Sequence, residues 1–104
     1  MDRADLEMVH AVHQHGSLAQ AAQALGLTPS AITRRLAALE DALGVRLFQR
    51  TTRRVSPTAE GETLSLRAAE LLRGFEAAEA ELRERQAEPA GPIRLAATFG
   101  FGRR

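Results

Sequence analysis

Three glycines divide the first 44 residues into short segments, each with apolar residues at helical spacing. Glycine often ends a helix, because it adopts the left-handed conformation after the last turn without strain. Gly16 and Gly26 are each followed within two residues by a side chain that typically starts a helix. The pattern predicts three short helices, over residues 2–15, 18–25 and 29–43.

The second and third helices have clear start signals. Ser17 opens the stretch Ser-Leu-Ala-Gln, a capping box in which Gln20 occupies the third helical position. Thr28 is a helix N-cap, and Pro29 suits the first turn, where its missing N–H costs no hydrogen bond. Two neighbouring helices joined by a short turn that contains glycine form a helix-turn-helix unit. The first helix supplies the surface on which this pair packs.

The third helix has an apolar face and a polar face. Its apolar stripe is formed by Ala31 or Ile32, Leu36, Leu39 and Leu43. The opposite face carries Ser30, Thr33, Arg34 and Ala37, with Arg35 at its flank. Small polar residues and arginine near a helix N-terminus suit entry into a DNA major groove, because bulk would block insertion and the helix dipole favours nearby phosphates. An ordinary solvated helix face has a similar composition, so this helix alone leaves both interpretations open.

The net charge of +1 conceals a strong segregation of charge along the chain. Residues 28–58 hold six arginines and two acidic residues, a balance of +4, whereas residues 59–88 hold four arginines and eight glutamates, a balance of −4. All 14 basic residues are arginine. Arginine suits phosphates and base edges, but codon bias in a GC-rich genome explains this usage more simply. The position of the basic block is therefore the more informative feature.

Residues 45–50 and 54–57 resemble two short strands around a basic tip. Leu47 and Phe48 would anchor this hairpin to the helices, and Val55 lies on the return strand. The tip contains no acidic residue and reads Arg50, Thr51, Thr52, Arg53 and Arg54. A basic hairpin directly after a helix-turn-helix is typical of the wing of a winged helix, which reaches the DNA backbone or minor groove. A solvated charged turn is the alternative, and the clustering of arginines favours DNA.

A long helix is predicted from a cap at Thr58 to about Ala87. Its apolar residues alternate at spacings of four and three, the pattern of a heptad seam. The seam consists of Leu64, Ala68, Leu71, Phe75, Ala78 and Leu82, and Leu72 widens it. Glutamates cover the other faces and would repel DNA, so this helix is predicted to pair with a second copy of itself. The alternative is a helix that folds back over its own domain.

Several other classes of function are not expected. The chain has no cysteine, no membrane-length apolar run and no export signal at its N-terminus, so we expect a cytoplasmic protein without disulfides. His10, His13 and Glu7 have a spacing that could bind zinc, but no fourth ligand is local. No nucleophile elbow or phosphate-binding glycine loop occurs. Neither an enzyme, nor a metal site, nor a cofactor is therefore predicted.

The sequence resembles the N-terminal domain of LysR-type bacterial transcriptional regulators. The resemblance covers roughly residues 3–95. It is carried by the stretches 16–22, 27–34, 39–40, 43–54 and 58–61, of which Leu-Gly-x-x-Leu-Phe-x-Arg at 43–50 is highly specific. The family often has Val-Ser in place of Ile32 and Thr33, and Gln or another polar residue in place of Arg35. These departures concern which bases are read.

The resemblance implies a set of DNA contacts. Helix 29–43 would be the recognition helix in the major groove, and wing 46–57 would lie on the backbone or in the minor groove. Ser30, Ala31, Thr33 and Arg34 would face base edges, with Arg35 on bases or phosphate. The full set of expected DNA-binding residues is Ser17, Thr28, Pro29, Ser30, Ala31, Thr33, Arg34, Arg35, Arg50, Thr51, Thr52, Arg53 and Arg54. Glu40 would be structural and pair with a wing arginine.

The expected fold is mainly α, a winged helix-turn-helix with a small β-hairpin wing and a long C-terminal dimerisation helix. Residues 1–58 would form the DNA-binding domain and 59–88 the linker helix. Residues 89–104 would be a hinge and the first strand of an effector-binding domain that is missing here. The expected partners are double-stranded DNA and a second copy, with a small-molecule effector only through the missing domain. The alternative is a protein-interaction module whose basic hairpin contacts an acidic protein.

Overall fold

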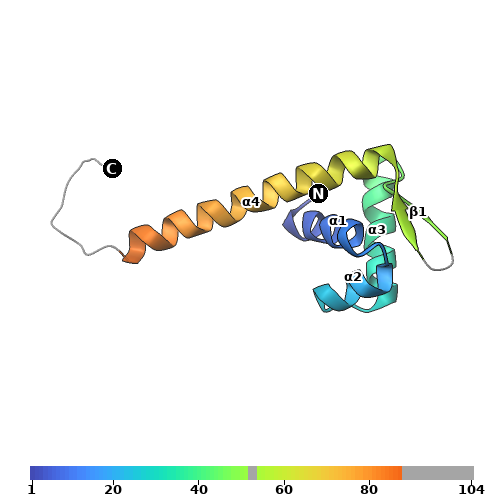
Figure 1. Ribbon diagram of the computed structural model, residues 1–104, viewed down its shortest axis with the longest axis horizontal. Helices are drawn as coiled ribbons and strands as arrows, with labels where there is room; N and C mark the ends of the chain where they lie inside the picture. The colour runs from blue at the N-terminus through green and yellow to red at the C-terminus, as the bar shows by residue number, and fades with distance from the viewer. Residues whose placement is uncertain (52–53, 88–104) are drawn as a thin grey trace. The chain divides into compact units, whose positions relative to one another are not determined.

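The structure is a computed structural model that describes residues 1–51 and 54–87. Its elements follow the chain in the order α1 (Arg3–His15), α2 (Leu18–Leu25), α3 (Pro29–Leu43), β1 (Phe48–Arg50), β2 (Val55–Pro57) and α4 (Ala59–Ala87) (Figure 1). The predicted fold, a mainly helical winged helix-turn-helix, is confirmed. The predictions for Thr52 and Arg53, and for the hinge and strand within 88–104, fall outside the described residues.

The chain divides into two compact units, Met1–Arg73 and Gly74–Arg104. The first unit contains the three short helices, the hairpin and the N-terminal half of α4. The described part of the second unit is the C-terminal half of α4. The first unit therefore holds every described residue that was predicted to contact DNA.

The helix starts follow from side-chain caps. The hydroxyl of Ser17 accepts a hydrogen bond from the backbone N–H of Gln20 at 3.2 Å, and that of Thr28 accepts one from Ala31 at 3.1 Å. The complete capping box lies instead at the start of α1, where Asp2 and Asp5 each accept a hydrogen bond from the other's backbone N–H. These caps satisfy N–H groups that a helix leaves without partners in its first turn.

The core of the first unit lies where the three short helices meet the start of the hairpin. Met8, Val9, Val12, Ile32, Leu36 and Phe48 are completely buried there. Phe48 is the first residue of β1, which pairs antiparallel with β2 in the register Phe48 opposite Pro57 and Arg50 opposite Val55. The strands are shorter than predicted, because Val45 and Arg46 are exposed and do not join the ladder. Leu47 and Phe48 anchor the hairpin as expected.

The N-terminal half of α4 packs against its own domain. Ala68 is completely buried, Ser65 is 5% exposed, and Leu64 packs against the core of the first unit. In the single chain the domain covers Ala68 completely and Leu64 in part, and their place in a seam with a second copy stays a prediction. The same heptad stripe is exposed further along α4, at Leu71 and Phe75.

Candidate nucleic-acid interface

The N-terminal part of α3 presents small polar residues and one arginine to solvent. Ile32, Leu36 and Leu39 turn one side of the helix into the core, which leaves the opposite side exposed. The exposed residues there are Thr28, Pro29, Ser30, Arg34 and Ala37. Thr33 is half-buried, and its hydroxyl donates a hydrogen bond to the carbonyl oxygen of Pro29 at 2.9 Å. This surface is free of bulky side chains and lies at the positive end of the helix dipole.

Ala31 and Arg35 lie at the flank of this surface. Both are half-buried. The guanidinium of Arg35 is 3.9 Å from the carboxylate of Asp5 on α1. Its charge is thus partly balanced within the domain, and its contact with bases or phosphate stays a prediction. The pair connects α3 to α1.

Hydrogen bonds between Thr51 and Arg54 join the two arms of the wing next to its tip, beyond the last pair of the strand ladder. The N–H of Thr51 donates to the carbonyl of Arg54 at 2.8 Å, and the N–H of Arg54 donates to the hydroxyl of Thr51 at 3.2 Å. The N–H of Val55 donates to the carbonyl of Gly16 at 3.3 Å, which joins the return strand to the turn between α1 and α2. The wing is therefore held next to the start of α2.

This junction brings together residues from two predicted groups. A polar hollow between the α1–α2 turn and β2 is lined by His15, Gly16, Ser17, Gln20, Arg54, Val55, Ser56 and Pro57. Ser17 and Arg54 were both expected to contact DNA, and both line this one hollow. Gln20 is a member that the sequence did not reveal as a site residue, although it is exposed beside Ser17. Only the return of the wing brings α2 and Arg54 together, and no local pattern encodes that return.

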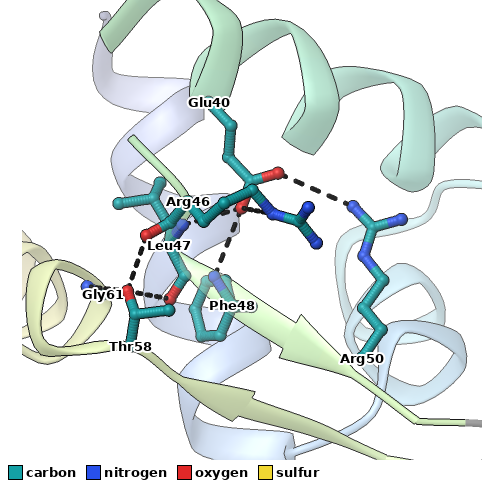
Figure 2. A network of polar contacts seen from close by, with 7 residues as sticks. All are labelled: Glu40, Arg46, Leu47, Phe48, Arg50, Thr58 and Gly61. Atoms are coloured by element: carbon teal, nitrogen blue, oxygen red, sulfur yellow. Dashed lines mark hydrogen bonds and ion pairs between the residues drawn. The ribbon is translucent and has the colours of Figure 1, made fainter. Parts of the chain in front are cut away.

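Glu40 connects α3 to the wing (Figure 2). Its carboxylate, 7% exposed, accepts hydrogen bonds from the backbone N–H groups of Leu47 at 2.7 Å and Phe48 at 3.2 Å. It also forms ion pairs with Arg46 and Arg50, both at 3.8 Å. The expected structural role of Glu40 is thus present, with two arginine partners and two backbone donors.

These ion pairs sort the arginines of the basic block. Arg35 pairs with Asp5, whereas Arg46 and Arg50 share Glu40. Within residues 1–51 and 54–87, Arg34 and Arg54 are the arginines of this block without an acidic partner. One lies on the exposed face of α3 and the other on the wing. The expected DNA contact of Arg50 stays a prediction, and in the free chain this side chain pairs with Glu40.

The histidines are not gathered into a metal site. His13 contacts the carboxylate of Glu62 on α4 at 2.5 Å, a pairing across two elements that the sequence did not predict. In the described ranges, no group of three or more His, Cys, Asp or Glu side chains is arranged to hold a metal ion. Over the same residues, no helix combines the length and apolar character needed to cross a bilayer.

A known protein family matches the part of the chain that forms this surface. The family described as "Bacterial regulatory helix-turn-helix protein, lysR family" matches residues 4–62. This chain belongs to that family. Among its relatives, the HTH-type transcriptional regulator DmlR of Escherichia coli (strain K12) is 37% identical over 99 residues, which are 95% of this chain and 32% of DmlR. The HTH-type transcriptional regulator PtxR of Pseudomonas aeruginosa is 41% identical over 91 residues, or 88% of this chain and 29% of PtxR.

Solved structures similar to this LysR-family chain include two DNA complexes. The CbnR_DBD–DNA complex matches with a TM-score of 0.72 and 34% identity, over 84% of this chain and 98% of that one. The BenM_DBD/catB site 1 DNA complex matches with a TM-score of 0.81 and 26% identity, over 86% and 100%. The chain spans about a third of the length of the curated relatives it matches.

Proposed function

We propose that this chain binds double-stranded DNA sequence-specifically, as the DNA-binding part of a LysR-type transcriptional regulator. The observation that carries the proposal is that one folded unit combines a basic wing with an exposed α3 N-terminus whose side chains are small. Its support from relatives is that the CbnR_DBD and BenM_DBD structures are DNA complexes and that the regulators DmlR and PtxR share its sequence. No catalytic step belongs to this function.

In this proposal α3 enters the major groove with its N-terminal turns. Arg34 offers a planar pair of donors that matches the O6 and N7 acceptors of guanine. Ser30 and Thr28 supply small hydroxyls, and their two oxygens lie 3.4 Å apart. Ala31 and the half-buried Thr33 border this surface and contact bases or sugars. The exposed ring of Pro29 presents apolar methylene groups to the groove.

Backbone contacts come from the other side of the unit. Arg54 and Ser17 line one polar hollow, which fits a phosphate that passes between the wing and α2. Thr51 lies at the wing tip and adds a hydroxyl. Thr52 and Arg53 belong to the same proposed contact, on sequence grounds alone. Such contacts fix the position of a protein on the duplex and make its affinity depend on salt.

The regulator acts as a homodimer through α4. Leu71, Phe75 and Leu82 are 50%, 44% and 65% exposed. They follow the heptad alternation with Ala78 between them, and Leu72 lies beside the stripe. A row of exposed apolar side chains on a helix is costly in water and typically pairs with a similar row. A two-fold dimer places two recognition helices on successive half-sites of a DNA duplex.

The remaining two thirds of the relatives' length lie outside this chain. A small-molecule effector would act through that missing part, and residues 89–104 would lead into it. A regulator of this kind works in the cytoplasm, where the bacterial chromosome lies. These assignments rest on the family and on the length of the relatives.

The test is selection of bound sequences from a random pool of DNA duplexes, followed by fluorescence anisotropy of the selected duplex at several salt concentrations. The expected result is an enriched sequence with two related half-sites and an affinity that falls steeply with salt. If no duplex binds in a salt-dependent way, DNA binding is excluded. A search for an acidic protein partner of the hairpin would then follow.

A further inference from the structure

The carboxylate of Glu40 faces two arginines in addition to the two backbone N–H groups that hold the start of the hairpin. Its Oε2 atom accepts the two backbone hydrogen bonds from Leu47 and Phe48, which fix the start of the hairpin. Its Oε1 atom lies 3.8 Å from a guanidinium nitrogen of Arg50, and the Nε of Arg46 lies 3.8 Å from Oε2. These two distances are too long for hydrogen bonds, so the arginines are held by charge. Figure 2 shows both side chains directed toward Glu40.

The charge attraction is strengthened by burial. Glu40 is 7% exposed, while the side chains of Arg46 and Arg50 are 68% and 30% exposed. A buried carboxylate is costly unless donors and cations surround it, so it keeps nearby cations close. The negative charge is thus fixed in the protein, and the two arginines can reach either Glu40 or the solvent.

The same arginines border the proposed DNA surface. They line an open hollow of about 500 Å³ between α3 and the wing, together with Ala37 and Asp41 from the exposed side of α3. A duplex that receives α3 would bring phosphates to this hollow. Phosphates are the same at every DNA sequence, so each extra arginine on a phosphate raises affinity for all sequences alike.

We infer that Glu40 limits sequence-independent DNA binding: by its charge it holds Arg46 and Arg50 away from phosphates and so lowers the affinity for every duplex. The inference rests on the proposed function and goes beyond it, because it assigns two of the six basic-block arginines to Glu40 rather than to DNA. Arg34 and Arg54 then supply the described cations that meet the duplex.

Glu40→Gln separates charge from anchoring. A glutamine oxygen can still accept from the N–H groups of Leu47 and Phe48, but the charge that holds the arginines is gone. The expected result is that the slope of log affinity against log salt for a random duplex steepens by about 1 to 2 units, because up to two more phosphates are neutralised. The affinities for the selected duplex and for a random duplex are expected to rise by about the same factor, because phosphate contacts do not depend on sequence.

Asp41→Asn is the matched control. Asp41 lines the same hollow and carries the same charge, but it has no ion-pair partner among the described residues. Its removal changes the local charge equally without releasing an arginine, so its salt slope is expected to stay within about half a unit of the parent's. Equal effects of the two substitutions would overturn the inference, since general charge would then explain both.

The arginines provide the second test. In the parent chain, Arg50→Gln is expected to leave the salt slope unchanged, while Arg54→Gln flattens it by about 1 unit. In the Glu40→Gln background, adding Arg50→Gln is expected to bring the slope back toward the parent value. Flattening by Arg50→Gln in the parent chain would show that Arg50 already lies on phosphate, and the inference would be wrong.

Folding and function have separate readouts here. Circular dichroism at the temperature of the binding measurements shows whether Glu40→Gln is folded. If it is not, the comparison of Arg50→Gln with Arg54→Gln in the parent chain decides the inference by itself. If the parent chain itself shows no salt-dependent binding to any duplex, that result contradicts the proposed function rather than this role of Glu40.

Discussion

Gly61 is buried in the first turn of α4, against the main chain of Leu47. A Cβ at this position would collide with the carbonyl oxygen of Leu47. The hydroxyl of Thr58 accepts from the N–H of Gly61 at 3.1 Å and donates to the carbonyls of Arg46 and Leu47 at 2.6 and 3.2 Å (Figure 2). The helix therefore begins in direct contact with the wing, and the absent side chain permits that contact.

Gly61→Ala is expected to destabilise the chain by about 1–3 kcal/mol, because the added methyl displaces a buried backbone. Gly74→Ala is the control, since a Cβ there would meet no atom within 4 Å. In the exposed interior of a helix, that change is expected to stabilise by up to about 1 kcal/mol. Urea unfolding of the two variants measures the contrast. A stabilising Gly61→Ala would show that α4 does not approach Leu47 so closely.

Arg34 and Arg54 are expected to differ in what they contribute to DNA binding. Arg34→Ala should weaken binding to the selected duplex by about 1–3 kcal/mol and relax the base preference at one position, because it removes a base contact. Arg54→Ala should weaken selected and random duplexes alike. Competition binding with single-base variants of the selected site distinguishes the two patterns. An equal loss on all sequences for Arg34→Ala would place Arg34 on the backbone instead.

The N-cap residue Asp2 makes the stability of the fold depend on pH. The hydrogen bond from the backbone N–H of Asp5 is the largest of the causes that lower the pKa of Asp2 from its ordinary value of 3.8. A lowered pKa in the folded chain means that the carboxylate stabilises the fold above about pH 4, and that this contribution is lost as the pH falls through the lowered pKa. Asp2→Asn keeps a cap without this titration. The melting temperature of the parent should therefore fall more steeply than that of Asp2→Asn between pH 4 and pH 2, and parallel curves would contradict this role.

Among the helices and strands, the ends of the helices could be predicted from the sequence, whereas the lengths of the hairpin strands could not. The bounds of α2 and α3 follow from local signals, the caps Ser17 and Thr28 and the glycines after each helix. The strands depend on distant partners: β1 begins only where Glu40 and Thr58 hold the backbone of Leu47. Contacts between distant residues of this kind leave no periodic pattern, so the sequence overestimated the length of the first strand.

The long helix shows a second limit of sequence patterns. A heptad stripe indicates that a face will be buried, but it does not say which surface covers that face. The domain itself covers Leu64 and Ala68, and solvent covers Leu71 and Leu82 in the single chain. Similarly, the sequence predicted that Glu40 pairs with a wing arginine, but it did not reveal that Asp5 pairs with Arg35, because that contact joins two different helices.

Leu71→Arg combined with Phe75→Arg is expected to yield monomers, because two charges would be buried in the proposed helix pair. Leu66→Arg is the control. Leu66 is also on α4 and is 63% exposed, but it lies outside the heptad stripe. Sedimentation velocity should show a dimer for the parent and for Leu66→Arg, and a monomer for the double variant. An unchanged sedimentation coefficient in the double variant would exclude this seam.

For the molecule as a whole, the near-neutral charge separates two tasks along the chain. The basic block of 28–58 coincides with α3 and the hairpin, and the acidic block of 59–88 coincides with α4. Glutamates along α4 disfavour its contact with phosphates and so keep the apolar stripe available for a protein partner. We therefore expect duplex binding to weaken with salt, while the dimer, held by apolar contacts, changes little.

Leu47 is held from both sides, its N–H by Glu40 of α3 and its carbonyl by Thr58 at the start of α4. One peptide stretch thus locks three elements, and none of Ser30, Thr33 or Arg34 takes part in that lock. The residues proposed to read bases can consequently be exchanged without disturbing the frame that presents them. This separation makes the domain a natural scaffold for new operator preferences, whether produced by divergence or by deliberate randomisation of the exposed α3 positions.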